Sequence, residues 1–506
     1  MSGTLPNQVF NGDQVKAVEQ IYAREHGGDC YDLMLKAGRA VYDQITKLQS
    51  RELNVWVFAG KGNNGGDGLV VASLLLGAGI SHRVFSLGQP REGTEAHKAF
   101  VDYTSKGGRI EYELPPDNSN PPDVIVDALL GTGLKSAPKP PCDDWILFIN
   151  RSHAFTISVD APSGLNADTG VVIEDCVRAD VTVCMLALKC GLLTSDAVDY
   201  AGKIVFASLD FDVSNFWGSG SSINPPEALP MLQKTYEDIT DTLPVRMRSA
   251  HKGDAGKVLV IGGAQGFCGA VCISALGALR AGAGLVKAAT CADSIAAINA
   301  RCPEIMTVDF TREDEMTKAL DFADVIAIGP GLGQDDHAAE LLSLVKDTDK
   351  PVIYDADALN LIARGEGEAA RRCVLTPHPA ECARLLETDI EEILNDRFRA
   401  CQNLQKRYGG ACLLKGAGSI ICDGRFLTVV NEGSPAMASG GMGDLLTGMV
   451  AALIAQGMAP RDALLGAACI HGRAGYMAGQ DSGVIGTIAT DLLVYVHSLV
   501  NGNDFN

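Results

Sequence analysis

Short apolar runs alternate with segments of helical periodicity along this chain, in two separate blocks. In the first block the apolar runs have the pattern of buried parallel strands. The predicted strands are residues 54–59, 82–87, 123–129 and 155–159, with a later strand at 203–209. Helical segments such as residues 69–76 lie between them.

The pattern stops at residues 212–230, where Gly, Ser, Asn and Pro occur without periodicity, so a domain boundary is predicted there. A second block restarts at residues 257–261 with a strand, a glycine turn and an Ala-rich helix that we expect to run through Leu285. Further strands are predicted at 325–328, 352–355, 374–376 and 411–415, and long helices close the chain. Both blocks predict doubly wound, open α/β sheets, which bind ligands beyond the carboxyl ends of their strands.

The composition narrows the class of protein. With 506 residues, 46% of them hydrophobic, the chain is too long for one ordinary core, so two domains are expected. A formal net charge of −20 argues against nucleic acid or an anionic membrane surface as the main partner. The 15 cysteines are scattered without a CxxC pair, which favours reduced thiols in a cytoplasmic protein over disulfides or zinc. Neither a signal peptide nor a membrane span is predicted.

The most informative string is Met437-Ala-Ser-Gly-Gly-Met-Gly-Asp444, which runs directly into the apolar segment 445–455. That segment predicts a buried helix, so the glycines present backbone N–H groups at a helix N-terminus, where the dipole favours an anion. Asp444 stands at the rim, where a carboxylate can take a proton from a substrate hydroxyl as a phosphate reaches it. Taken alone, the string suits a glycine turn capped by Asp444 equally well.

In the first block, the string Gly60-Lys-Gly-Asn-Asn-Gly-Gly-Asp-Gly68 follows a predicted strand and opens a helix. This places backbone N–H groups where a phosphate docks, although asparagines beside glycines also suit a purely structural turn. The string is neither the spaced dinucleotide fingerprint nor a Walker loop. Two more strand ends carry polar residues, in Asp127-Ala-Leu-Leu-Gly-Thr-Gly133 and Asp160-Ala-Pro-Ser163.

Three of these strand ends offer Asn64, Asp127 and Ser163, which converge on one edge if the sheet is parallel. One carboxylate with neutral oxygens suits a hard, weakly bound cation better than a transition metal. Asp160 is the candidate acid or base. Either aspartate, considered alone, also suits a helix cap.

The second block carries six glycine or proline turns, each predicted after a strand and all in one order. Five of them begin at Gly262, Gly329, Asp355, Thr376 and Lys415. The sixth is the glycine turn before Asp444, a nest of backbone N–H groups. Singly each signal is weak, because His378 between two prolines also suits a rigid surface turn and Lys415 also suits a solvated strand end. Six such turns in one order are hard to explain as purely structural turns, so together they favour a ligand site.

The strings of the first block resemble the NAD(P)H-hydrate epimerase domain over roughly residues 10–212. The resemblance implies a Rossmann-like fold in which Asp160 contacts the substrate and moves protons. It also implies potassium bound by Asn64, Asp127 and Ser163. The dinucleotide phosphates and sugars would be held by two loops: Asn63, Asn64, Gly65, Gly66 and Asp67, and then Gly131, Thr132, Gly133, Leu134, Lys135, Ser136 and Ala137.

The ordered turns of the second block are similar to the ADP/ATP-dependent NAD(P)H-hydrate dehydratase domain of the ribokinase-like group, over about residues 240–500. This implies that the nucleotide is gripped by Lys415, Gly416, Ala417, Gly418, Ser419 and Gly443. It also implies that the hydrated nicotinamide is faced by Ala270, Gly331, Gly333, His378 and Asp444. Two positions depart in detail: Ala380 stands where Gly is usual, and Ser419 where Thr is usual.

Together the two resemblances imply an enzyme of nicotinamide nucleotide repair, an isomerase and a lyase in one chain. It would interconvert the R and S forms of hydrated NADH or NADPH. It would dehydrate the S form at the expense of ADP or ATP, with magnesium, giving AMP or ADP and phosphate. Asp444 would accept the hydroxyl proton during phosphoryl transfer while the glycine N–H groups hold the developing charge.

Three other functions fit part of the sequence. A vitamin or sugar kinase of the ribokinase group would use the same nest and aspartate, but it leaves the first block and the string Thr376-Pro-His-Pro379 unexplained. A non-catalytic binding module would be expected to lack Asp160. A dehydrogenase is disfavoured because no spaced dinucleotide fingerprint occurs.

We therefore expect an epimerase domain over residues 1–215 and a dehydratase domain over residues 225–506. The expected partners are small molecules, namely the hydrated dinucleotides and ADP or ATP, rather than nucleic acid or membrane. The expected assembly is a homo-oligomer, and the expected location is cytoplasmic.

Overall fold

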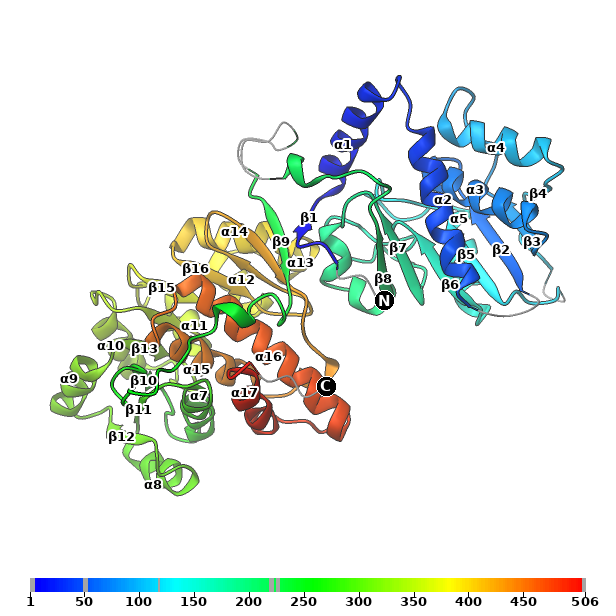
Figure 1. Cartoon of the computed structure of the whole chain (residues 1–506). Coiled ribbons are helices and arrows are strands. Elements are labelled where there is room, and N and C mark those ends of the chain that lie inside the picture. The colour runs from blue at the N-terminus through cyan, green and yellow to red at the C-terminus, as the bar shows by residue number, and fades with distance from the viewer. Residues whose placement is uncertain (1–4, 49–52, 117–118, 218–222, 224–227, 503–506) are drawn as a thin grey trace. The chain divides into compact units, whose positions relative to one another are not determined.

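The computed structural model of this chain describes residues 5–48, 53–116, 119–217, 223 and 228–502. The chain divides into two compact units, Met1–Gln233 and Lys234–Asn506 (Figure 1). In the predicted boundary segment 212–230, residues 218–222 and 224–227 lie outside the described residues.

The sheet of the first unit is parallel throughout, in the order β4-β3-β2-β5-β6-β7-β8. Counted along the chain this is the order 3-2-1-4-5-6-7, which contains the doubly wound Rossmann order, with the switch point between β2 and β5. The strands are β2 (Asn54–Ala59), β3 (Ser81–Ser86), β4 (Ile110–Glu111), β5 (Val124–Ala128), β6 (Phe155–Val159), β7 (Val181–Met185) and β8 (Lys203–Ala207). The helices are α1 (Gly12–Glu25), α2 (Tyr31–Thr46), α3 (Asn63–Gly77), α4 (Glu95–Ser105), α5 (Cys142–Arg151) and the short α6 (Ala197–Tyr200). A further short strand, β1 (Gln8–Val9), pairs antiparallel with β9 (Met231–Lys234).

Strand β2 shows why the sequence NVWVFA forms a central strand. Val55 and Val57 pack into the core shared with α2, α3 and α4, whereas Trp56 and Phe58 pack into the core on the opposite face. There Phe58 meets Trp145 of α5 edge to face, with ring centroids 5.8 Å apart. Because side chains of a strand alternate between faces, a strand that is apolar on both must be covered by helices on both (Figure 1).

The second unit repeats this order. Its sheet runs β12-β11-β10-β13-β14-β15-β16-β17-β18, again 3-2-1-4-5-6-7 for the parallel strands, with the switch point between β10 and β13. The parallel strands are β10 (Lys257–Ile261), β11 (Leu285–Thr290), β12 (Met306–Asp309), β13 (Val325–Ile328), β14 (Val352–Tyr354), β15 (Cys373–Leu375) and β16 (Ala411–Leu414). An antiparallel hairpin, β17 (Ser419–Cys422) and β18 (Leu427–Val430), continues from β16.

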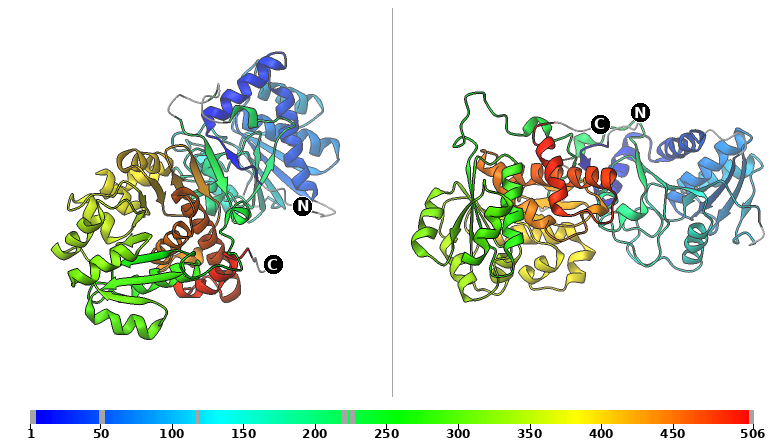
Figure 2. Two further views of the ribbon diagram at one scale, coloured as in Figure 1. Left: turned by 60° about the vertical axis from the view of Figure 1, so that its left-hand side comes forward. Right: turned by 90° about the horizontal axis from the view of Figure 1, so that it is seen from below.

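Helices cover both faces of this second sheet, as the two further views show (Figure 2). They are α7 (Cys268–Arg280), α8 (Ala292–Arg301), α9 (Glu313–Phe322), α10 (Asp336–Val345), α11 (Asp357–Ala363), α12 (Pro379–Leu386), α13 (Ile390–Asn395), α14 (Arg397–Tyr408), α15 (Met442–Ala455), α16 (Pro460–Ser482) and α17 (Leu493–Leu499). The buried helix predicted after Asp444 is confirmed as α15, which packs against α7. A side chain at Gly448 would collide with the backbone carbonyl of Ser274, so the glycine permits this close packing.

The predicted α/β class is confirmed, and β2, β6, β10 and β13 have the predicted bounds. The predicted end of one helix was wrong. The Ala-rich helix ends at Arg280 instead of Leu285, because Gly282, with φ of 101°, turns the chain into β11. The hairpin β17–β18, which was not among the predicted strands, adds two antiparallel strands to the second sheet.

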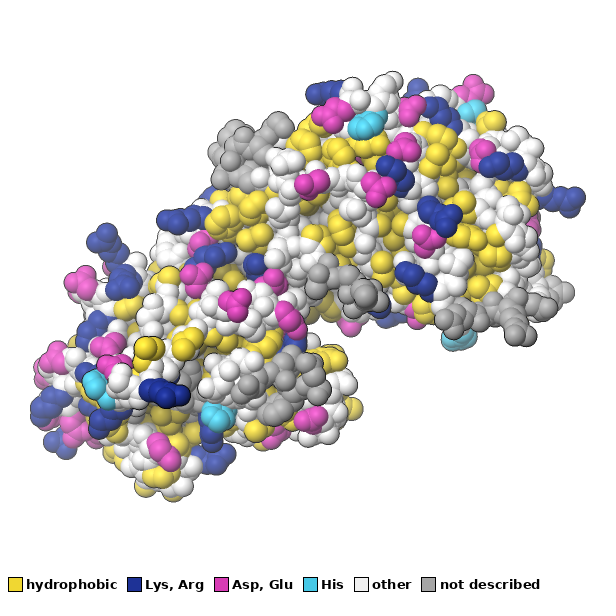
Figure 3. Space-filling model, in the orientation of Figure 1, with side chains coloured by type: hydrophobic (Ala, Val, Ile, Leu, Met, Phe, Trp, Pro, Cys, Tyr) yellow, Lys and Arg dark blue, Asp and Glu magenta, His cyan; other side chains and the backbone are white. Residues whose placement is uncertain are grey.

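Acidic and basic side chains are interspersed on the face drawn in Figure 3. That face therefore offers no continuous basic stripe of the kind that nucleic acids bind. All 15 cysteines are free thiols. Among the described residues, no helix combines the length and the apolar character needed to cross a bilayer.

Candidate active sites

The switch point of the first sheet gathers the strand-end oxygens that the sequence singled out. Asp127, the fourth residue of β5, is fully buried. Its carboxylate accepts hydrogen bonds from Ser163 Oγ at 2.6 Å, Ser163 N at 2.9 Å and Ser158 Oγ at 2.8 Å, and from Leu129 N at 3.3 Å. Burial raises the pKa of Asp127, and the bonds from Ser163 and Ser158 oppose that rise.

Asn64, in the first turn of α3, reaches the same place from the neighbouring loop. Its Nδ2 donates to the carbonyl of Leu130 at 2.7 Å, and Ser163 Oγ lies 3.2 Å from that carbonyl. The three side chains are therefore brought together around one carbonyl and one buried carboxylate. The predicted loop from Gly131 to Ala137 forms a turn beside Asn64, since a Cβ on Gly131 would lie 3.2 Å from that of Asn64.

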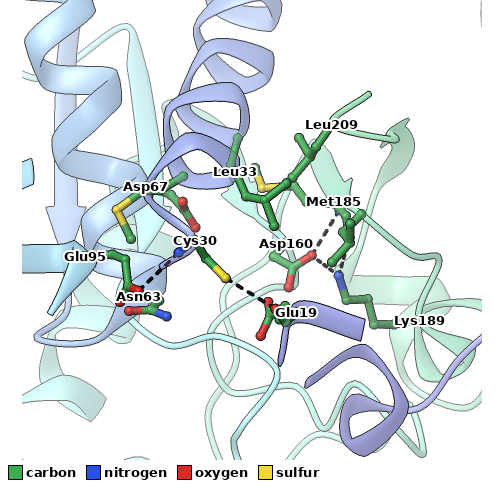
Figure 4. A pocket seen from close by; sticks show the side chains of 13 residues that line it. Glu19, Cys30, Leu33, Asn63, Asp67, Glu95, Asp160, Met185, Lys189 and Leu209 are labelled. Atoms are coloured by element: carbon green, nitrogen blue, oxygen red, sulfur yellow. Dashed lines mark hydrogen bonds and ion pairs between the residues drawn. The ribbon is translucent and has the colours of Figure 1, made fainter. Parts of the chain in front are cut away.

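A pocket opens beside this cluster and holds Asp160 (Figure 4). Asp160 follows β6 with φ of 68°, a left-handed conformation that is unusual for an aspartate. Its Oδ1 accepts from the backbone N of Met185 at 3.0 Å and from the ammonium group of Lys189. Lys189 Nζ also donates to the carbonyl of Met185 at 2.7 Å. The carboxylate is thus held in one orientation by two donors.

Lys189 is the residue of this site that sequence reasoning missed. Its side chain is 1% exposed. Burial opposes its charged form, but Asp160, with smaller contributions from Cys184 and Glu19, outweighs that cost, so the pKa of Lys189 lies above its usual value. The available signal was a single lysine inside the apolar run Met185-Leu-Ala-Leu-Lys-Cys-Gly-Leu-Leu193, because a lysine there needs a buried partner.

The rest of the pocket is acidic and apolar. Asn63 and Asp67, both predicted, line it together with Glu19, Glu95 and Cys30, which were not (Figure 4). Burial, with a smaller contribution from Asp160, raises the pKa of Asp67 well above its usual value. Burial also raises the pKa of the Cys30 thiol to about 11, so this cysteine is not a thiolate nucleophile.

In the second unit, the predicted Lys415 is paired with a buried acid. Lys415, directly after β16, donates from Nζ to Oδ1 of Asp355 at 2.6 Å, and Thr447 of α15 donates to the other oxygen of Asp355 at 2.7 Å. A Cβ on Gly443 would lie 2.9 Å from Lys415 Nζ. Lys415 and Gly443, both predicted to hold the nucleotide, therefore adjoin.

Asp444 lies in the first turn of α15, after Gly441, whose φ of 86° makes the left-handed N-cap. The first N–H groups of a helix have no intrahelical acceptor, so the backbone at Met442 and Gly443 presents donors at this end. Burial and the neighbouring carboxylate of Asp355 raise the pKa of Asp444 to about 7. An acid with that pKa can both take and return a proton at neutral pH.

Three of the residues predicted to face the substrate lie on the loops at the second switch point. A Cβ on Gly331 would lie 3.2 Å from that of Ala270, in the first turn of α7. The backbone N of Gly333 donates to Asp357 at 3.0 Å, and Asp357 is one of the acids that raise the pKa of Asp444.

His378 has a structural role as well as its predicted one. It is the N-cap of α12: its Nδ1 accepts from Ala380 N at 3.1 Å, and its own N–H donates to Glu381 at 2.8 Å. The ring remains 48% exposed. Because Lys415 N donates to the carbonyl of Pro377 at 2.9 Å, this capped turn adjoins the loop of Lys415.

The chain thus has two doubly wound sheets. One carries Asp160 at a strand end, and the other carries Asp444 after a glycine turn. This arrangement defines an α/β enzyme with two sites. The profile of the family described as NAD(P)H-hydrate dehydratase matches residues 258–497, and that described as YjeF-related protein N-terminus matches residues 30–191. The chain is 37% identical to the bifunctional NAD(P)H-hydrate repair enzyme Nnr of Vibrio cholerae over 98% of this chain and 99% of that protein. Identity to the Escherichia coli enzyme of the same name is 38%, over 98% of this chain and 95% of that protein.

The chain therefore belongs to the family of bifunctional NAD(P)H-hydrate repair enzymes. A solved ribokinase-like superfamily protein of Enterococcus faecalis is 28% identical, with a TM-score of 0.50, and covers 54% of this chain and 96% of that protein. The ribokinase-like fold predicted for the second block is thus confirmed.

Proposed function

We propose that this chain returns hydrated NADH and NADPH to their active forms in two steps. The first step interconverts the R and S hydrates, and the second dehydrates the S form while consuming ADP or ATP. Family membership supports the pair of activities. The observation that carries the second is Asp444, with a pKa of about 7, in the glycine-led first turn of α15 beside Lys415 and Asp355.

In the dehydratase site, we propose that Asp444 accepts the proton of the ring hydroxyl as that oxygen attacks the terminal phosphate of the nucleotide. Lys415 and the N–H groups at Gly443 stabilise charge on the transferred phosphoryl group, whose magnesium arrives with the nucleotide. The ring C–O bond then breaks with loss of a ring proton, and phosphate departs. The nucleotide contacts are those predicted from Lys415 to Ser419, and Ala270, Gly331, Gly333 and His378 face the ring.

In the epimerase site, we propose that Asp160 moves the proton of the hydroxyl at the carbon whose configuration changes. Support comes from its two donors, Met185 N and Lys189 Nζ, which fix one carboxylate oxygen. Lys189 donates to the Asp160 carboxylate and stabilises negative charge that passes to the substrate oxygen. Asn63 and Asp67 line the same pocket and are proposed substrate contacts.

We also propose potassium as the cation of the epimerase site. The donor set supports a monovalent ion, because Asp127 supplies one carboxylate and Asn64 and Ser163 supply neutral oxygens. Asp127 is fully buried and its pKa is raised by that burial, so a cation beside it would be stabilising. When bound, the ion would offset the negative charge shared by Asp127 and the dinucleotide phosphate.

The boundaries proposed for the two activities remain those predicted, 1–215 for the epimerase and 225–506 for the dehydratase, close to the division of the chain after Gln233. We retain two further proposals. The 15 free cysteines support a reducing, cytoplasmic location. A homo-oligomer is proposed as well, and sedimentation equilibrium tests it.

The decisive experiment mixes the full chain with an epimer mixture of hydrated NADH and follows the near-ultraviolet absorbance of the reduced nicotinamide, with ADP and ATP in parallel. Wild type should recover both epimers. Asp160→Asn should recover the S half quickly and the R half at the spontaneous rate, and Asp444→Asn should recover neither. Nucleotide consumption without absorbance recovery would contradict the proposal and point to a small-molecule kinase.

A further inference from the structure

The nucleotide loop proposed above rests on a buried arginine. Arg397, the first residue of α14, is 3% exposed. Its Nη1 donates to the carbonyl of Ala417 at 2.7 Å, and its Nη2 donates to those of Leu414 at 3.3 Å and Lys415 at 3.1 Å. One guanidinium therefore binds three of the four backbone carbonyls from Leu414, the last residue of β16, to Ala417.

The fourth carbonyl is also fixed. Ser419 Oγ donates to the carbonyl of Gly416 at 3.1 Å, so each of the four carbonyl oxygens from Leu414 to Ala417 has a side-chain donor. Gly416 is needed for this arrangement, because its φ is 144° and a Cβ there would lie 2.6 Å from Arg397 Nη2. The loop is thus shaped around the guanidinium.

This arrangement determines where the loop N–H groups point. In a trans peptide the carbonyl and the following N–H point in opposite directions. Since the carbonyls of Lys415 and Ala417 point at Arg397, the N–H groups of Gly416 and Gly418 point away from it, toward the outer side of the loop. These two N–H groups stand on alternate residues of the loop, and backbone N–H groups that face one side of a turn bind anions.

The guanidinium also contributes charge. Burial lowers the pKa of Arg397 to about 10, which leaves it protonated at neutral pH. Its positive charge lies behind the loop in a region from which water is excluded, where charges interact more strongly than at a surface. Arg399, two residues later on the same helix, lacks these features: its side chain is 65% exposed and pairs with Asp396.

We infer that Arg397 is a positioning residue for nucleotide binding, which turns the N–H groups of Gly416 and Gly418 toward the phosphates and places a positive charge behind them. The inference rests on the proposed nucleotide-dependent dehydratase. It assigns Arg397 to affinity for the nucleotide and not to affinity for the hydrated dinucleotide or to the proton transfer at Asp444.

The test uses full-length Arg397→Met and Arg397→Lys, with Arg399→Met as the matched control. Kd for ADP and ATP is measured by calorimetry, and KM is measured separately for the nucleotide and for hydrated NADH. Arg397→Met should raise the Kd for ADP about tenfold or more, the loss expected for charge-assisted hydrogen bonds, and should raise that for ATP further. In Arg397→Met, KM for hydrated NADH and the rate of epimer exchange should stay within about twofold of wild type. In Arg399→Met, the nucleotide Kd should also stay within about twofold.

The lysine variant separates charge from geometry. Arg397→Lys keeps the charge but cannot reach three carbonyls, so it should recover only part of the nucleotide affinity. If Arg397→Met does not fold, Gly416→Ala provides the second test, because its Cβ displaces the loop from Arg397 while the charge remains. It should weaken nucleotide binding without changing KM for hydrated NADH.

The outcomes are distinguishable. If wild type binds no ADP or ATP, the proposed dehydratase function fails. If wild type binds nucleotide while folded Arg397→Met and Gly416→Ala bind it equally well, the inference about Arg397 is overturned. A loss of kcat with unchanged nucleotide Kd overturns it too.

Discussion

Lys415 Nζ lies 2.6 Å from Oδ1 of Asp355, and the pair joins the ends of two strands that are 60 residues apart in the chain. Asp355 is almost fully buried, and Thr447 of α15 binds its second oxygen. The acid therefore holds Lys415 at the N-terminus of α15 instead of leaving it in solvent. A lysine fixed in this way is pre-organised to meet a phosphate.

Replacing Lys415 by Met should destabilise the second unit as well as weaken nucleotide binding. Asp355 would be left buried without its cation, which costs on the order of 3–5 kcal/mol in comparable pairs. The double variant Lys415→Met with Asp355→Asn should regain much of the stability but none of the nucleotide affinity. Chemical denaturation and ADP calorimetry of the single and double variants check both parts, and equal stability of wild type and Lys415→Met would contradict the first.

The dehydratase should show a pH dependence set by Asp444. Its pKa is raised to about 7, and the base must be ionised to act, so kcat/KM should rise with pH through about 7. At pH 6 the activity should be about tenfold below its plateau. In Asp444→Asn, dehydratase kcat/KM should fall by on the order of 10²–10⁴-fold at all pH values, and its rise with pH through about 7 should disappear. Epimer exchange by the same variant should stay near wild type, and its cooperative thermal unfolding shows that the second unit is folded.

The same raised pKa predicts an effect on stability whose sign can be checked. An acid with a higher pKa in the folded state than in the unfolded state favours folding only while it is protonated. The contribution of Asp444 is therefore fully present below about pH 4 and is lost as the pH rises through about 7. Asp444→Asn should consequently melt at a higher temperature than wild type at pH 8, with a smaller difference at pH 5.

The sequence predicted the positions of the site residues better than the side chains with which those residues pair. Three predicted strands ended one residue late, at Asp355, Thr376 and Lys415, because a polar residue at a strand end leaves the ladder to enter the site. The glycine turns could be read because Gly and Asn carry their conformational preference locally. The hairpin β17–β18 could not be separated from a loop, since its short apolar runs suit either.

Pairings across the sheet were out of reach of a local pattern. Asp160 meets Lys189 because β6 lies beside β7, and Asp355 meets Lys415 because only β15 separates β14 from β16 in the order of the sheet. One sequence without its structure does not contain that order. Arg397 was missed for the same reason: it is the charged first residue of an amphipathic helix, and only the packing of α14 against β16 and β17 buries it.

Lys189→Met should strongly slow epimer exchange while leaving the dehydratase intact. Without its ammonium group, Asp160 loses one of its two donors and the site loses the charge that balances it, so epimer exchange should slow by on the order of 10²-fold or more. Lys98→Met is the matched control, because the Lys98 ion pair with Asp29 is exposed and contributes little. Exchange is followed by chromatography of the two hydrates. Near-normal exchange in folded Lys189→Met would remove this residue from the mechanism.

The last prediction separates a cation site from a structural cap at Asp127. If Asp127 only caps the loop that follows β5, replacing it should cost about 1 kcal/mol of stability and little epimerase activity. The four hydrogen bonds at its carboxylate, from Leu129, Ser158 and Ser163, already predict a larger structural cost for Asp127→Ala. Stability alone therefore does not decide between the two roles.

The cation dependence does decide. If Asp127 holds potassium with Asn64 and Ser163, wild-type exchange should fall when potassium is replaced by tetramethylammonium, which is too large for the site. Asp127→Asn, which keeps the size and one acceptor oxygen, should exchange slowly in both salts and show no difference between them. Asn64→Ala, whose side chain leaves the Asp127 hydrogen bonds untouched, should weaken the response to potassium. If wild type exchanges at the same rate in both salts, Asp127 is a buried structural acid and the proposed potassium site is wrong.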